Sequence, residues 1–289
     1  QFGAQSSIIA RVSSAYQNPF ATYLSGVVYE ANDEPGDAFV DYKNAYQIVP
    51  SPLLASEVGR LARRLNRRDE AAALGLTVPK GKPAAAGETL VIVDNGFAPR
   101  RRELKFPIPT PQTALFVAVP LTDPVPTDLG EVEVLDAAGT PIGRTEMLVD
   151  IEAMSVRDLH DRYPGILVRQ FIRMAAKEGA AYGAQTAAGD NTTAAIVAGI
   201  GTSLFNAVTE QADLRTWYAL PRSIHVAHVA TLPGETETTL RLLDVAGRPL
   251  RDVKVPIVSS SGKLKLVVVR YVDGRVLVQT PSATTAGTH

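Results

Sequence analysis

The 289-residue sequence predicts an α+β fold, in which N-terminal helical hairpins precede an antiparallel β-sandwich-like domain with a helical insertion. Three observations lead to this prediction. Apolar residues recur at helical spacing in residues 1–77, and a linker rich in proline, glycine and alanine occupies residues 78–88. Apolar or alternating runs separated by turn residues then fill residues 89–281, interrupted by the insertion at 151–216, and a tail follows at 282–289.

Residues 18–50 predict two short antiparallel helices joined by the turn sequence NDEPG. Gly26 and Ala38 are small where the two backbones would approach each other, and Pro50 ends the second helix. The residues that suit such packing recur at fixed intervals: Gly26, Tyr29, Ala38, Tyr42, Ala45 and Pro50. This spacing is similar to that of a tetratricopeptide repeat, a unit that binds other proteins. We therefore expect a protein-binding helical region.

Two further segments extend this region. Residues 8–16 are apolar at helical spacing and indicate either the second helix of a preceding unit or a capping helix. Residues 53–65 predict an amphipathic helix whose arginines form a solvated surface with Asp69 and Glu70 or, alternatively, contact lipid phosphates or an acidic partner. The candidate partner-binding residues are aromatic or basic: Tyr23, Tyr29, Phe39, Tyr42, Tyr46, Arg60, Arg64 and Arg68.

After the linker the pattern predicts strands at 89–93, 114–119, 131–135, 144–149, 224–230, 238–243, 253–258, 263–271 and 275–280. Asp273-Gly274 between two alternating runs predicts a tight hairpin. The prolines at 107, 109 and 111 restrict that segment to a sheet edge or a loop, and residues 141–143 predict a turn.

Within the insertion, Ser155 and Asp158 predict a helix start, and Pro164 predicts its end or restart. Residues 166–177 carry apolar side chains on one face: Leu167, Phe171, Met174 and Ala175. A further helix, rich in small residues, is predicted after Asp190 or Asn191. We expect these helices to pack on one face of the β-domain, and a pore-lining or membrane-inserting hairpin is the alternative.

Composition and motifs restrict the chemistry. The formal net charge of -1 gives no reason to expect nucleic-acid binding, and the absence of cysteine excludes disulfides and thiolate ligands. His225 and His228 lie three apart in a predicted strand, so their side chains would point to opposite faces. The sequence contains no nucleophile elbow, phosphate-binding loop, HExxH or GxGxxG motif. We therefore predict no catalytic, cofactor-binding or metal-binding residue.

The run TEQADLRTWYALP at residues 209–221 carries the most distinctive polar cluster. A catalytic interpretation makes Glu210 or Asp213 an acid or base that Arg215 holds in place. The structural interpretation, which we favour, pairs Asp213 with Arg215 internally and has Trp217 anchor the end of the helix on the sheet.

Several stretches together resemble a family of uncharacterised bacterial envelope lipoproteins: NPFATYLSGVVYEAN, DAFVDYKNAY, VDNGFAPRRREL, DLHDRYPGILVR and TEQADLRTWYALP. The resemblance implies a signal peptide and a lipid-modified cysteine upstream of Gln1. It also implies an outer-membrane-anchored protein of the periplasm, often found beside lipoproteins of the penicillin-binding-protein-activator type. No catalytic residues are established for that family, so the resemblance implies none here.

From these observations we expect a non-enzymatic scaffold or adaptor lipoprotein of the cell envelope. Its partners would be proteins of an envelope assembly, with copies of itself as one alternative, and membrane attachment would occur only through the upstream lipid. A lipid- or glycan-binding periplasmic module is the second hypothesis, with an apolar groove between the insertion helices and the sheet. An envelope hydrolase is the third.

Overall fold

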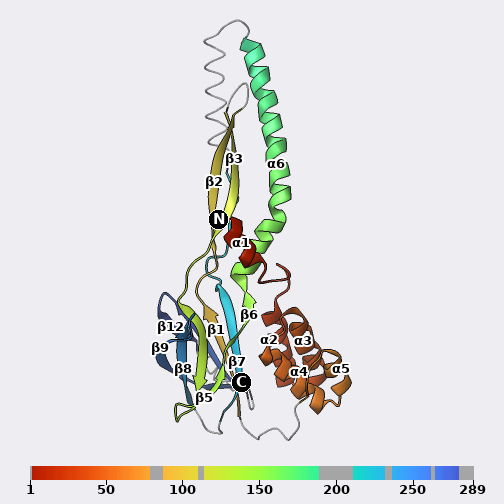
Figure 1. Cartoon of the computed structure of the whole chain (residues 1–289), viewed down its shortest axis with the longest axis vertical. Helices are drawn as coiled ribbons and strands as arrows, with labels where there is room; N and C mark the ends of the chain where they lie inside the picture. The colour runs from red at the N-terminus through yellow and green to blue at the C-terminus, as the bar shows by residue number, and fades with distance from the viewer. Residues whose placement is uncertain are drawn as a thin grey trace, which may run out of the picture.

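The computed structural model describes residues 2–78, 87–109, 114–188, 211–231, 236–261 and 264–279. The chain forms a mixed α+β fold in which N-terminal helices precede the strands and one further helix lies between two strands, which confirms the predicted α+β class. Figure 1 shows a compact body from which a stalk projects. The stalk consists of the two-stranded ribbon β2 (Arg100–Pro109) and β3 (Ala114–Asp123) and of the long helix α6 (Ile151–Ala188).

The N-terminal region contains α1 (Phe2–Ile9), α2 (Pro19–Ala31), α3 (Pro35–Ile48), α4 (Pro52–Arg64) and α5 (Arg68–Ala73). The side chains of Asn18 and Ser51 accept hydrogen bonds from the first-turn N–H groups of α2 and α4. A proline in the first turn of α2, α3 and α4 fixes a helical φ where no N–H partner is needed. The predicted hairpin is therefore present, but the helix expected at 8–16 is wrong, because α1 ends at Ile9.

Two sheets form the rest of the body. The central sheet has the order β10 (Val258–Ser261), β11 (Leu264–Val272), β1 (Gly87–Asn95), β7 (Ser223–Thr231), β6 (Glu146–Asp150), and β12 (Arg275–Gln279) also pairs with β11. The second sheet has the order β5 (Pro141–Arg144), β4 (Leu129–Leu135), β8 (Glu237–Asp244), β9 (Pro249–Pro256). Strand pairs are antiparallel except β1–β11, which is parallel.

The hairpin predicted at Asp273-Gly274 is confirmed. These two residues join β11 to β12 with φ angles of 48° and 74°, the left-handed pair that a two-residue type I′ turn requires. The turn predicted at 141–143 is wrong, because this segment is strand β5 and pairs with β4.

The central sheet is covered on both faces, which explains the continuous apolar run in β1. Leu90 and Ile92 share a core with the helices, whereas Val91 and Val93 share a core with the second sheet. Because successive side chains of a strand alternate between faces, one strand serves both cores. Figure 1 shows the helices on one side of β1 and β7 and the strands β8 and β9 on the other.

The insertion helix departs from the prediction in three ways. α6 begins at Ile151, where the carboxylate of Asp150 accepts a hydrogen bond from the N–H of Ala153, and not near Ser155. Pro164 lies inside the helix and does not end it. α6 also packs along β3 and not on a face of the body, since both faces of the central sheet are already covered. The second predicted insertion helix lies outside the described residues.

No helix among the described residues combines the length and the hydrophobicity that crossing a membrane requires.

Candidate functional site

The aromatic residues proposed as partner anchors divide into two groups. Tyr23, Phe39 and Tyr42 are completely buried in the core of the helices, so they stabilise this region and are not available to a partner. Tyr29 is 37% exposed, and Tyr46 packs partly buried against the same core. The correction has a simple physical cause: large aromatic side chains at helix–helix contacts are the ones that fill a small core.

Close packing at Gly26 is confirmed. A Cβ atom added at Gly26 would lie 2.6 and 2.7 Å from two ring carbons of Tyr42, and 3.3 Å from the carbonyl oxygen of Ala38. The absence of a side chain at Gly26 therefore allows α2 and α3 to approach each other. Pro50 lies two residues beyond the end of α3, as predicted.

The three candidate arginines also differ. Arg60 is largely buried and bridges two carboxylates, with Nη1 2.5 Å from Glu30 Oε1 and Nη2 in contact with Glu57 Oε2. Arg64 is half exposed and pairs with Asp33 at 2.9 Å, and Arg68 is exposed. Arg60 therefore belongs to the interior of the helical region, while Arg64 and Arg68 remain at its surface.

A buried ionic cluster joins the helices to the central sheet. Glu57 of α4 is 2.5 Å from Nδ1 of His228 on β7, and Nε2 of His228 is 3.6 Å from Glu88 on β1. Both Glu57 and His228 have side chains less than a tenth exposed. Arg60 adds a second cation beside Glu57, so the carboxylate has an ionic partner on its own helix and another on the sheet.

The pKa values of this pair follow from burial and from the partner charge. Burial alone would lower the pKa of His228, but the charge of Glu57 and its hydrogen bond raise it to about 10. Burial alone would raise the pKa of Glu57, but His228 and Arg60 hold it at about 2. Both groups are therefore charged at neutral pH, and each compensates the buried charge of the other.

His225 lies on the opposite face of β7 from His228, as the spacing predicts. Its Nε2 is 2.9 Å from the hydroxyl of Ser223, and burial lowers the pKa of His225 to about 4. The described residues contain no group of three or more His, Asp or Glu side chains that could hold a metal ion.

A second ionic cluster fixes the base of the stalk. Glu152 at the start of α6 is buried and accepts hydrogen bonds from Arg11 at 2.6 Å and from Arg222 at 2.9 Å. A pocket of about 260 Å³ adjoins it, between the N-terminal segment and β6. Met147, Met154 and the buried Asp150 line this pocket, and burial raises the pKa of the Asp150 carboxyl.

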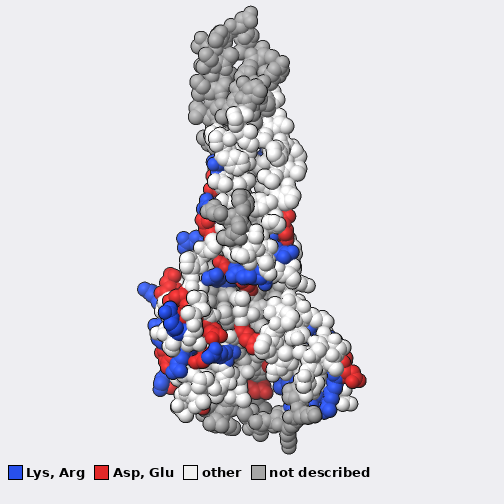
Figure 2. All heavy atoms as spheres, in the orientation of Figure 1, with Lys and Arg blue, Asp and Glu red and all other residues white. Residues whose placement is uncertain are grey.

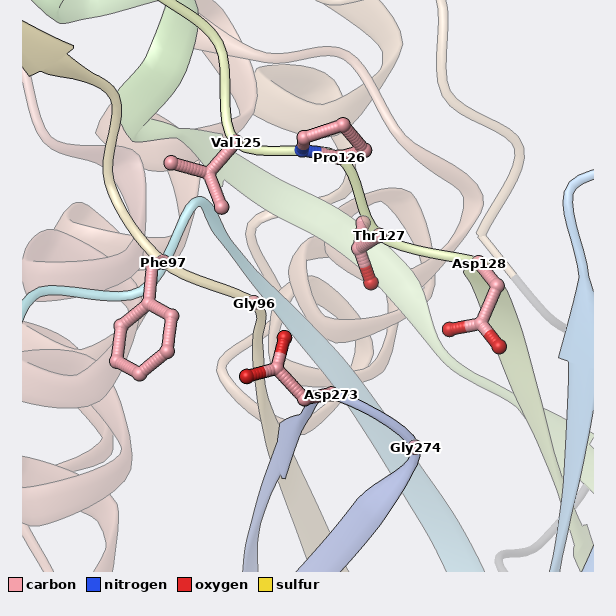
Figure 3. A pocket seen from close by; sticks show the side chains of 8 residues that line it. All are labelled: Gly96, Phe97, Val125, Pro126, Thr127, Asp128, Asp273 and Gly274. Carbon is pink, nitrogen blue, oxygen red and sulfur yellow. The ribbon is translucent and has the colours of Figure 1, made fainter.

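A hollow of about 460 Å³ opens at one end of the central sheet, as Figure 3 shows. Its lining comes from three segments far apart in the sequence: Gly96, Phe97, Val125, Pro126, Thr127, Asp128, Asp273 and Gly274. The hollow contains two carboxylates, those of Asp128 and Asp273. Asp128 already accepts a hydrogen bond from the hydroxyl of Tyr271 at 2.7 Å. No single stretch of the sequence could have indicated this hollow.

The run at 209–221 does not have the predicted anchoring role. Arg215 pairs with Asp213 at 2.9 Å, but the Arg215 side chain is 91% exposed, so the pair lies on the surface and not inside. Trp217 is 78% exposed and does not anchor a helix on the sheet. The physical reason is that residues 211–215 form no helix and lie beside β2, where the N–H of Ala212 donates to Glu103 at 2.7 Å. Glu210 lies outside the described residues.

Within the stalk, helix α6 exposes an apolar face, which we call its outer face. The four side chains of this face are 40–64% exposed: Leu167, Val168, Phe171 and Ile172. On the opposite side of the helix, Gln170 is buried and donates a hydrogen bond to the carbonyl of Ala118 at 3.0 Å. The prediction of an apolar stripe on this helix was correct, but the structure exposes Leu167 and Phe171 instead of packing them on the body.

Comparisons of the chain with protein-family models, with curated proteins and with solved structures found no match. The function is therefore inferred from the geometry of the molecule.

Proposed function

We propose that this protein is a non-enzymatic scaffold or adaptor of the bacterial cell envelope, acting in the periplasm and binding partner proteins through the outer surface of its helical region. In this proposal the helices are tetratricopeptide-like and the two sheets form a sandwich. The packing of α2 on α3 at Gly26 and the core shared by the two sheets support these two finer assignments.

One observation carries the proposal. The α2–α3 hairpin exposes three large apolar side chains, Val28 at 53%, Tyr29 at 37% and Val40 at 39%, although its inner aromatic residues are fully buried. Scattered exposed apolar residues are normal on a surface, but three on one short hairpin, one of them aromatic, are the side chains that this region offers to a partner. Tyr29 is therefore the retained anchor among the predicted aromatic residues.

The buried ionic cluster supports the same proposal, because its charged groups have a structural role. Glu57, His228 and Arg60 have the strongly shifted pKa values that often mark a catalytic site, but they pair with one another between the helices and the sheet. Their pairing holds the α2–α4 helices in a fixed position on the body. A rigid, preorganised surface loses less entropy when it binds a partner.

The test is affinity purification from native membranes with Tyr29→Asp/Val40→Asp, followed by mass spectrometry. Val245→Asp is the matched control, because Val245 is 80% exposed but lies between β8 and β9, away from the hairpin. We expect specific partners to be lost from the hairpin variant and retained by the control, with circular dichroism unchanged in both. Retention of every partner by a folded hairpin variant would disprove the proposal.

A ligand-binding module is the second candidate, and the 260 Å³ pocket beside Asp150 is the observation that favours it. Its apolar wall and buried carboxyl suit a small amphiphile. Native mass spectrometry of the protein purified from its own cells tests this candidate. A bound small molecule that Met154→Trp displaces would support ligand binding, and the absence of any bound molecule would contradict it.

A further inference from the structure

The stalk changes its charge character at one level along its length. β2 residue Glu103 pairs in register with Pro120 of β3, and the hydroxyl of Tyr163 on α6 donates to the Pro120 carbonyl at 2.7 Å. These three residues therefore mark the same height on all three elements of the stalk. We call distal stalk the residues beyond this level whose side chains the structure describes, namely 104–109, 116–119 and 164–176.

Below this level, charges of both signs pair with each other. The ion pairs are Arg102–Asp123 at 2.8 Å, Arg162–Asp158 at 2.8 Å, Arg101–Asp158 at 3.6 Å and Arg157–Asp161 at 3.7 Å. The distal stalk contains three basic residues, Lys105, Arg169 and Arg173, and no acidic residue, and Lys105 pairs with Glu103 of the boundary level at 3.5 Å. Figure 2 shows this change as red and blue patches on the body and the stalk base, followed by a mostly white surface.

The outer face of α6 within the distal stalk is apolar where a solvated helix would be polar. Val168, Phe171 and Ile172 follow the spacing that places side chains on one helix face, and each is more than half exposed. Arg169 and Arg173 are four residues apart and border this face. An exposed apolar face bordered by basic residues is typical of a helix that lies on an anionic membrane surface.

We propose that the outer face of α6 in the distal stalk binds the surface of a phospholipid bilayer that contains anionic lipids. Phe171, Ile172 and their neighbours enter the boundary between headgroups and acyl chains, while Arg169 and Arg173 lie near lipid phosphates. This contact is separate from the protein-binding surface at Tyr29, so either proposal can fail without the other.

The charge of the distal stalk favours a bilayer over a second copy of the chain. A second copy docked on the same face would bring two basic stalks together, and like charges at short range repel. An anionic lipid surface instead attracts each basic residue. Among the described residues β2 and β3 form a two-stranded ribbon, and a strand edge without partners could not satisfy its backbone hydrogen bonds in hydrocarbon, so the proposed contact is to the bilayer surface.

The first experiment is flotation of the chain of residues 1–289 with vesicles of phosphatidylcholine, with or without phosphatidylglycerol. We expect flotation with phosphatidylglycerol that weakens as salt is raised. Phe171→Ser/Ile172→Ser should lower the partition coefficient about tenfold or more, and Arg169→Gln about fivefold. The matched control Val245→Ser/Leu277→Ser replaces two exposed apolar residues of the body and should leave it unchanged.

The second experiment reports which surface touches lipid. The chain has a single tryptophan, so Trp217→Phe gives a dark background for Phe171→Trp or, as the control, Leu277→Trp. We expect vesicles to shift the emission of Phe171→Trp to shorter wavelength and to leave that of Leu277→Trp unchanged.

Three results would overturn the proposal. The first is the absence of flotation of the wild-type chain with anionic vesicles. The second is equal flotation of Phe171→Ser/Ile172→Ser. The third is concentration-dependent self-association in sedimentation that this double variant abolishes while vesicle binding persists, which would assign the face to a second copy.

Discussion

The contact between the helices and the central sheet differs from the contact between α6 and the β2–β3 ribbon, although both join segments far apart in the sequence. The first combines a shared apolar core with a buried pair of opposite charges, Glu57 and His228. The second includes two hydrogen bonds from side chains to the backbone of β3 and leaves Phe171 and Ile172 largely exposed. At the first contact the buried apolar and charged groups are paired within the chain, whereas the stalk leaves apolar side chains exposed where another molecule could bind.

The largest expected effect concerns the ionic pair of the body. Glu57→Gln removes the buried counter-charge of His228, leaving only the half-exposed Glu88 at 3.6 Å, and should cost about 3–5 kcal/mol of unfolding free energy, measured by urea denaturation. Glu57→Leu/His228→Leu removes both charges and should recover much of this loss. Asp252→Asn breaks an exposed pair with Arg241 and should leave the unfolding curve unchanged. A small effect of Glu57→Gln would mean that the pair does not stabilise the contact.

The packing of α2 on α3 should be the next most sensitive feature. Gly26→Leu places atoms where the ring of Tyr42 lies and should cost about 1–3 kcal/mol. Gly36→Ala is the matched control on the same hairpin, because nothing lies within 4 Å of a Cβ atom added there. An unchanged Tm for Gly26→Leu, measured by circular dichroism, would contradict the close contact.

The pH dependence of stability should report the same ionic pair. The pKa of His228 is raised from 6.5 to about 10, so its contribution is complete below pH 6.5 and is lost as the pH rises towards 10. The pKa of Glu57 is lowered from 4.5 to about 2, so its contribution is lost as the pH falls from 4.5 towards 2. Arg60 and Glu88 are the other charged groups at this site.

The measurement is Tm against pH for the wild type and for His228→Gln. Between pH 7 and pH 10 the wild-type Tm should fall, and the curve of the variant should be flatter. Parallel curves would show that His228 does not titrate as the geometry of the pair requires.

The smallest expected effect lies at the stalk base. Arg215→Ala removes an ion pair that is almost fully exposed, and such pairs contribute little in water. We expect no measurable change in Tm by differential scanning fluorimetry. A clear decrease would restore the internal role that the sequence suggested for Arg215.

Local signals predicted much of the fold. The Asp273-Gly274 turn, the α2–α3 hairpin and the apolar run of β1 each depend on neighbouring residues, so a sequence is sufficient to recognise them. The position of α6 depended on which elements cover the faces of the central sheet, and no local sequence pattern shows this. The central sheet already had both faces covered, so the apolar residues of α6 were directed outwards along β3.

The candidate sites also divide into those set by neighbouring residues and those set by the packing of distant segments. Arg60, Glu57 and His228 are distributed over α4 and β7, and their contact depends on how the helices dock on the sheet. Sequence reasoning noted His228 only because its side chain and that of His225 would point to opposite faces of a strand, which gave no site. Tyr29 remained a candidate because it lies on a short hairpin whose inner and outer faces follow from helical periodicity.

The length of α6 has a mechanical consequence. At 1.5 Å per residue, its 38 residues extend over about 57 Å, and its first turn is clamped through Glu152 by Arg11 and Arg222. A tilt of about 10° at this clamp would move the far end by about 10 Å. Because Tyr163 and Gln170 also tie α6 to β3, the helix and the ribbon would tilt together, and a small displacement at Arg11 would be amplified along the length of the stalk.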